Sequence, residues 1–195
     1  MSNTINSPLV SNYSYMLKHY YSKNRDAAKK IHRANMKDEV LVTADSHALS
    51  KVAKGLRDLD YTSDNGVGIY NNVKAFIETY NNFIGSSSDS LDRNISHTRK
   101  LLTKTIKENS EELESIGITI LSSGKLSLDK TELAKCSSSK VKKVFSEYSD
   151  LTKKIKFYAG KIYKASFKLN LSTPNEIPEQ NAVPGQPANH IDVSL

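Results

Sequence analysis

The feature that most constrains this chain is a run of apolar residues in the segment 140–169, separated by alternating steps of three and four. The members of the run are Val141, Val144, Tyr148, Leu151, Ile155, Tyr158, Ile162, Ala165 and Leu169. This spacing, sustained over about four heptads, is typical of the seam of a coiled-coil helix. A helix of that length, roughly 42 Å, cannot bury an apolar stripe by itself. The pattern therefore predicts a second long helix to pair with it.

The partner is predicted over 24–59, near the other end of the chain. Its C-terminal half repeats the seam at Val42, Leu49, Val52, Leu56 and Leu59. Its N-terminal half would place polar residues, Asn35 and Asp45 among them, in the same seam. Either these residues help to select one register, or the helix rotates so that Ala34, Leu41 and Ala48 share the contact.

An antiparallel arrangement of the two helices predicts a register. If Leu59 lies near Val141, facing positions have numbers that sum to about 200. Asp38 and Glu39 would then lie near Lys161 and Lys164, and the ion pairs would help to set the register more than the stability.

The residues between the two long helices predict three further elements. Helices are expected over 67–84 and 88–116, followed by a β-hairpin over 118–128 where the apolar period changes from helical spacing to alternation. The predicted fold class is therefore mainly α, with two long paired terminal helices and a helical lobe that carries one small β-hairpin. These elements form a single helical domain over 23–169.

The two ends of the chain have different compositions. Segment 1–22 is polar and contains four tyrosines, which either fold back onto the helical domain or bind a partner. Segment 170–195 holds four of the five prolines and almost no apolar periodicity. We expect this tail to be disordered.

The positive charge is concentrated on one predicted helix. The net charge is +7, and segment 140–168 alone has nine lysines against Glu147 and Asp150. Such a segment could bind nucleic acid through its phosphates, with Phe157 or Tyr163 available for stacking. However, the segment has no arginine for bidentate base contacts, and its lysines flank an apolar seam as on any solvated helix face. Nucleic acid is therefore the alternative, less favoured than a protein partner.

No grouping of residues indicates catalysis. The five histidines are scattered without a metal-binding spacing, and a single cysteine, Cys136, excludes a multi-cysteine metal site. Asp45, Ser46 and His47 contain the atoms of a hydrolase triad, but adjacent positions of a helix point in different directions. We expect a non-enzymatic protein without cofactor or metal.

The sequence has no apolar run of about 18 residues, so no membrane insertion is expected. Its first residues lack the basic start and apolar stretch of a secretory signal. The expected location is thus the cytoplasm, where the chain is synthesised.

The middle of the chain, from about 69 to 169, resembles the C-terminal region of the flagellar filament cap protein, also called flagellar hook-associated protein 2. The resemblance rests on the order and spacing of "VKAFIETYNNFI", "LESIGITILSSGKLSLDKTELAK" and "VKKVFSEY". The matching residues are Phe76, Tyr80, Asn81, Ile116, Gly117, Ile118, Gly124, Leu126, Leu128, Asp129, Leu133, Val144 and Phe145. Compared with the family, this chain is reduced and lacks the large inserted domains.

The motif residues have structural roles that need no family to explain them. Gly117 and Gly124 suit backbone positions with positive φ, and Asp129 is placed to cap a helix. Leu126 and Leu128 alternate so that they can bury one face of a hairpin.

The resemblance implies a structural protein that acts through helix–helix association, either with itself or with a flagellin-like partner. It also implies a bacterial flagellum as the destination, outside the cell, reached by export without a cleaved signal. Oligomers are compatible with this interpretation.

Overall fold

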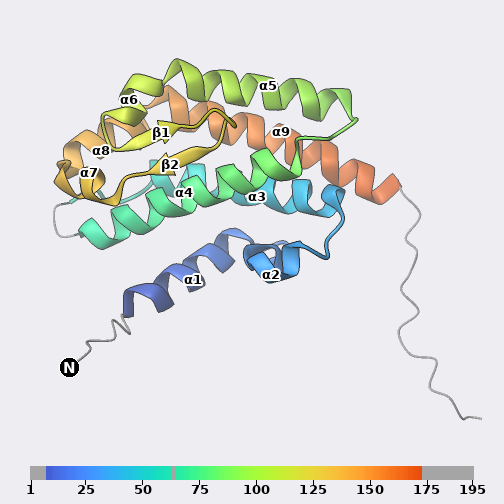
Figure 1. Cartoon of the computed structure of the whole chain (residues 1–195), viewed down its shortest axis with the longest axis horizontal. Coiled ribbons are helices and arrows are strands. Elements are labelled where there is room, and N and C mark those ends of the chain that lie inside the picture. Colours follow the sequence, from blue (N-terminus) through green and yellow to red (C-terminus); the bar gives the residue numbers. More distant parts are fainter. Residues whose placement is uncertain (1–7, 63–64, 173–195) are drawn as a thin grey trace, which may run out of the picture.

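The computed structural model describes residues 8–62 and 65–172, and these form a mainly helical fold with one small antiparallel β-hairpin (Figure 1). The predicted fold class is confirmed. The elements, with η1 a short 3-10 helix, are α1 (Pro8–Tyr20), η1 (Arg25–Ala28), α2 (Lys30–Arg33), α3 (Asp38–Arg57), α4 (Gly66–Ser86), α5 (Arg93–Glu108), α6 (Ser110–Glu114), β1 (Ile118–Ile120), β2 (Leu126–Leu128), α7 (Lys130–Lys135), α8 (Ser138–Phe145) and α9 (Asp150–Ser172).

The body of the molecule is built from α3, α4, α5 and α9. Helix α3 packs most extensively against α9 and next against α4, while α5 packs against α9 (Figure 1). Helices α3 and α9 run antiparallel, because His47 contacts Tyr163 whereas Ser50, further along α3, donates to the carbonyl of the earlier residue Lys156. The pairing of one helix from each half of the chain is thus present.

The register of this pair differs from the predicted one. The residue numbers of facing residues sum to 210 for His47 and Tyr163 and to 206 for Ser50 and Lys156, rather than to about 200. Asp38 and Glu39 consequently line a hollow together with residues 166 and 169, about one turn beyond the predicted lysines.

Most residues of the predicted seam are buried inside the chain. The buried members are Val42, Leu49, Val52, Leu56, Val141, Val144, Leu151, Ile155 and Ile162. Leu59 and Tyr158 are half-buried and pack against this core. Tyr148 lies outside the seam, because it is 79% exposed. Leu169 is 40% exposed and lines the hollow with Asp38 and Glu39 at the end of the helix pair.

The predicted helix over 140–169 is interrupted at 146–149, and this break explains the position of Tyr148. Ser146 adopts an extended backbone at the end of α8, and the Ser149 hydroxyl accepts from the amide of Leu151 at the start of α9. The turn lets α8 take its own direction, with Phe145 fully buried at 5.5 Å from the Phe76 ring. The heptad spacing continues across the break although the helix does not.

The predicted helix over 24–59 is also interrupted, and only α3 forms its long part. Asn24 does accept a hydrogen bond from the Ala27 amide, but the helix that it caps is the short η1. In one continuous helix Arg33 and Asp45 would be about 18 Å apart along the axis. The break brings the Arg33 guanidinium onto the Asp45 carboxylate, with both nitrogen–oxygen distances at 2.7 Å.

The remaining helices agree with the predictions in place but not in every boundary. Helix α4 extends slightly beyond both ends of the predicted 67–84. The predicted helix over 88–116 begins only at Arg93, where Asp92 caps it by accepting from the Ile95 amide, and it divides into α5 and α6. Leu91, which precedes the cap, is 98% exposed.

The hairpin contains the motif residues in structural roles. Ile118 pairs with Leu128 and Ile120 pairs with Leu126, which is buried, while Leu128 is half-buried against the core. Gly117 and Gly124 both have positive φ, and a Cβ on Gly117 would lie 3.0 Å from the Asp129 carbonyl oxygen. The Asp129 side chain caps α7 by accepting from the amides of Thr131 and Glu132.

The hairpin is attached to α4 by an amide side chain. Asn81 donates to the Leu126 carbonyl at 2.8 Å and accepts from the Leu126 amide at 2.7 Å, so it acts as a neighbouring strand would. The Tyr80 hydroxyl donates to the Gly124 carbonyl at 3.2 Å. These contacts give the Tyr-Asn pair of the sequence motif a role within the fold.

The N-terminal segment predicted over 1–22 contains helix α1, which packs on α3 and α4. Leu17, Tyr20 and Tyr21 are buried there, whereas Tyr15 is exposed, so the tyrosines at the end of the helix fold back onto the body. The predicted tail over 170–195 begins within α9 and lies, from residue 173 on, outside the described residues.

The packing of α9 on α3 generates a stability prediction. Replacing the fully buried Ile155 by Ala (Ile155→Ala) should lower the free energy of unfolding by about 2–5 kcal/mol, since it removes apolar contacts and leaves a cavity. The measurement is urea denaturation followed by circular dichroism. The matched control is Phe157→Ala on the exposed face of the same helix, and a larger loss for Phe157→Ala would contradict this packing.

Candidate functional site

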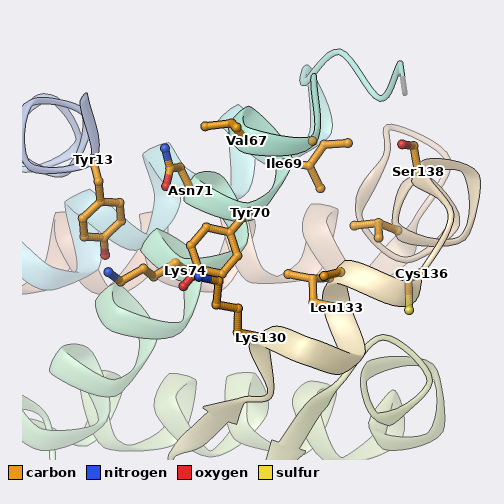
Figure 2. A pocket seen from close by; sticks show the side chains of 13 residues that line it. Tyr13, Val67, Ile69, Tyr70, Asn71, Lys74, Lys130, Leu133, Cys136 and Ser138 are labelled. Carbon is orange, nitrogen blue, oxygen red and sulfur yellow. The ribbon is translucent and has the colours of Figure 1, made fainter. Parts of the chain in front are cut away.

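An apolar groove of about 540 Å³ opens between the N-terminal half of α4 and the helices α7 and α8, with α1 at one end (Figure 2). We call it the α4–α7 groove. Its lining residues are Tyr13, Gly66, Val67, Ile69, Tyr70, Asn71, Lys74, Lys130, Leu133, Ala134, Cys136, Ser138 and Val141. Its volume is in the range of about 300–1,000 Å³ that is usual for ligand pockets.

Two helix caps place the α7 and α8 side of the groove. Asp129 begins α7, so that Lys130 and Leu133 lie one turn apart on its side toward α4. The Ser137 hydroxyl begins α8 by accepting from the Lys140 amide, and Val141 follows one turn later. The groove therefore depends on these two capped helix starts, which precede the predicted long helix.

The floor of the groove is apolar and belongs to the core. Ile69, Leu133 and Val141 are all buried and still contribute to its lining. Val67 is 50% exposed, so its side chain is accessible to a ligand from outside. A ligand with aliphatic groups would replace water on this surface at a gain of about 25 cal/mol per Å² buried.

The other half of the groove is aromatic and positively charged. The Lys74 ammonium lies 4.1 Å from the centre of the Tyr13 ring, and the Lys130 ammonium lies 5.6 Å from the centre of the Tyr70 ring. The Tyr13 hydroxyl donates to the Glu78 carboxylate, and burial together with this carboxylate raises the pKa of Tyr13. Figure 2 shows Tyr13, Lys74 and Tyr70 toward one end of the groove and Leu133 and Ser138 toward the other.

A second polar cluster lies in the interior rather than at a surface. The fully buried Asp45 carboxylate accepts from Arg33, from the Tyr21 hydroxyl at 2.9 Å and from the Ser86 hydroxyl at 2.7 Å. The Asn82 amide donates to the Tyr21 hydroxyl at 2.9 Å. Burial works to lower the pKa of Arg33, but the Asp45 carboxylate raises it above its ordinary value. These bonds connect the N-terminal region to α3 and α4 and satisfy the carboxylate.

The triad-like residues Asp45, Ser46 and His47 do not meet. The Ser46 hydroxyl donates to the Val42 carbonyl of its own helix, and the His47 ring packs at 4.8 Å from the Tyr163 ring. Burial lowers the pKa of His47. Among the described residues, no group of three or more histidine, cysteine or acidic side chains is arranged to hold a metal ion.

The lysines of α9 lie mainly on its solvent side. Lys153, Lys154, Lys161, Lys164 and Lys168 are exposed, and Lys156 is half-buried. Phe157 projects among them with 60% of its surface exposed, and its ring centre lies 5.7 Å from the Lys161 ammonium. This is the surface on which the nucleic-acid alternative depends.

Sequence reasoning did not identify the groove. Its polar residues Tyr70 and Lys74 lie on α4 beside the apolar stripe that the helical spacing revealed, and Lys130 lies in another element. The one sequence feature that could have indicated the groove is the pair of large side chains, Tyr70 and Lys74, one helical turn apart. Only the packing of α7 beside α4 brings Lys130 to Tyr70.

Comparison of the chain with protein-family models, with curated proteins and with solved structures finds no match. The resemblance to the flagellar cap protein therefore stays a prediction that rests on the quoted residues. Within residues 8–62 and 65–172, no helix combines the length and the apolar character needed to cross a membrane.

The buried Asp45 cluster generates a second stability prediction. Asp45→Ala should lower the free energy of unfolding by about 3–5 kcal/mol, because it leaves the Arg33 charge and two hydroxyl groups without their acceptor. Asp26→Ala is the control, since Asp26 is 59% exposed and its pairs with Lys29 and His32 are worth at most about 1 kcal/mol. Thermal and urea unfolding measure both variants. Equal losses would show that the cluster is not stabilising.

The buried tyrosines predict a loss of stability at alkaline pH. Burial raises the pKa values of Tyr20, Tyr21 and Tyr80 in the folded protein, whereas tyrosines of the unfolded chain ionise near about pH 10. Above that pH the folded state holds more protons than the unfolded state, so the free energy of unfolding should fall as the pH rises.

Tyrosinate absorbance and circular dichroism, recorded over one alkaline titration, measure this effect. Buried tyrosines should ionise together with unfolding, and Tyr21→Phe should weaken the pH dependence while Tyr15→Phe at an exposed position should not. Complete tyrosine ionisation with an intact helical spectrum would contradict the expectation.

Proposed function

We propose that this chain is a non-enzymatic protein-interaction module that binds a segment of another protein in the α4–α7 groove. The observation that carries the proposal is a preformed apolar floor, made by Ile69, Leu133 and Val141, at the bottom of an accessible groove. Concave apolar surfaces with a few polar groups are the usual sites of ligand binding, and hydrophobic grooves also bind the apolar face of amphipathic protein segments.

The predicted seam supports this location indirectly. Most of its members on α3 and α9 are buried by packing within the chain, so they leave little apolar surface for a partner helix. The groove, in contrast, keeps both apolar and aromatic side chains accessible. Docking of a partner segment is therefore favoured over self-assembly through the long helices.

The resemblance to the cap protein suggests which partner to test. If the resemblance reflects function, the partner is flagellin-like and presents helical segments. We therefore propose flagellin from the same genome as the first candidate partner, with the bacterial flagellum as the corresponding location.

A charged substitution in the groove tests the proposal. Val67→Asp should weaken flagellin binding at least about tenfold, because it places a carboxylate on an apolar contact surface. An acidic residue in the first turn of a helix is compatible with folding, since it complements the helix dipole. Biolayer interferometry with immobilised flagellin measures the affinity, and circular dichroism checks the fold.

The matched control is Val40→Asp, which changes an exposed valine in the first turn of α3, away from the groove lining. It should bind like the unmodified chain. Equal affinities for the Val67 and Val40 variants would contradict binding in the groove, and no affinity of the unmodified chain for flagellin would remove flagellin as the partner.

The alternative of nucleic-acid binding is favoured by Phe157 and its surrounding lysines on α9. The same instrument tests it with a single-stranded oligonucleotide over a series of salt concentrations. Phosphate contacts predict an affinity that falls steeply with salt, and Lys161→Glu together with Lys164→Glu should abolish it. Absence of salt-dependent binding would remove this alternative.

A further inference from the structure

We propose that the α4–α7 groove recognises a protein segment with acidic side chains at one end and aliphatic side chains at the other. This inference rests on the proposed function and adds the chemistry of the partner. It is based on the uneven distribution of charge and apolar surface along the groove (Figure 2).

The positive end of the groove is formed by two lysines from different elements. Lys74 comes from α4 and Lys130 from α7, and each ammonium group lies over a tyrosine ring. Neither takes part in an ion pair with another residue of the ranges 8–62 and 65–172. The described lining residues include no carboxylate. The Glu78 carboxylate accepts from the Tyr13 hydroxyl but is not part of the lining, so the two ammonium groups that the groove presents at this end are complementary to an anionic group.

The ring contacts leave the lysines able to bind such a group. A lysine ammonium over an aromatic ring keeps its charge. Because it has three N–H donors, it can still donate to a carboxylate on the side away from the ring. The Tyr70 ring lies beside Lys130 and offers an apolar surface there (Figure 2). This arrangement suits acidic side chains on a segment that continues along the groove.

The apolar end of the groove selects the aliphatic half of the segment. Leu133, Ile69 and Val141 are buried core residues with no charged group among them. Aliphatic side chains of a partner can pack there at little cost in desolvation. The lining side chains come from four helices, from Tyr13 on α1 to Ser138 on α8 (Figure 2). Hydrophobic grooves between helices are also known to bind amphipathic protein segments.

Charge reversal tests the recognition. The probes are two short synthetic peptides with a leucine-rich half, joined to glutamates in one peptide and to lysines in the other. We expect the glutamate peptide to bind the unmodified chain at least about tenfold more tightly than the lysine peptide. In the double variant Lys74→Glu and Lys130→Glu the order should reverse. Fluorescence anisotropy at low salt measures the affinities.

The matched control is Lys100→Glu with Lys107→Glu, which changes the net charge equally at positions of α5 outside the groove lining. This variant should keep the original preference. Circular dichroism checks that each variant folds. A control that loses the preference as fully as the groove variant would overturn the inference, because the effect would then come from the net charge.

The remaining outcomes separate this inference from the proposed function. If both peptides bind equally and Val67→Asp abolishes their binding, the charge preference is overturned but the groove remains a protein-binding site. The same conclusion follows if neither peptide binds but flagellin binds and Val67→Asp weakens that binding. Binding of dodecanoate instead of the peptides, lost in the same variants, would overturn a protein segment as the occupant. Binding of neither peptides nor flagellin would overturn both proposals.

Discussion

Helix α3 is packed on two sides, against α9 and against α4, and the arrangement of the other elements depends on this double contact. A helix covered in this way must bury more than one stripe, and α3 does so with Ala44, Ala48 and Ala53 besides its larger residues. Small side chains let neighbouring helices approach closely. Helix α5 then covers α9, and the hairpin covers α4, so that each outer element rests on a helix that α3 holds in place.

The breaks in the two predicted long helices allow the Arg33–Asp45 ion pair and the α4–α7 groove to form. A continuous helix over 24–59 could not pair Arg33 with Asp45, and that ion pair fixes the N-terminal region against α3. A continuous helix over 140–169 would remove the separate direction of α8. The serine-rich turn at 146–149 gives α8 that direction, and with it the wall of the α4–α7 groove that Val141 and Ser138 provide.

The groove combines two kinds of surface, one apolar and one positively charged. Its floor consists of core residues, and its other end carries two lysines over tyrosine rings. Neither part alone would indicate a partner, since exposed lysines and partly exposed aliphatic residues are common on protein surfaces. Their continuity, from four helices that meet only in the folded chain, supports the proposed recognition of an amphipathic segment.

The sequence by itself determined the fold class, the hairpin and most of the residues that face the core. Apolar spacing reports which positions must be buried, and Val42, Leu49, Ile155 and Ile162 are buried accordingly. Spacing does not report whether the backbone continues through a polar turn, so Tyr148 was wrongly placed in the seam and the helix predicted from residue 88 begins only at Arg93. The tertiary structure alone decided the register of α3 on α9, the ion pair of Asp45 and the groove. Each of these depends on contacts between residues far apart in the chain, and local sequence patterns do not report the strength of such contacts.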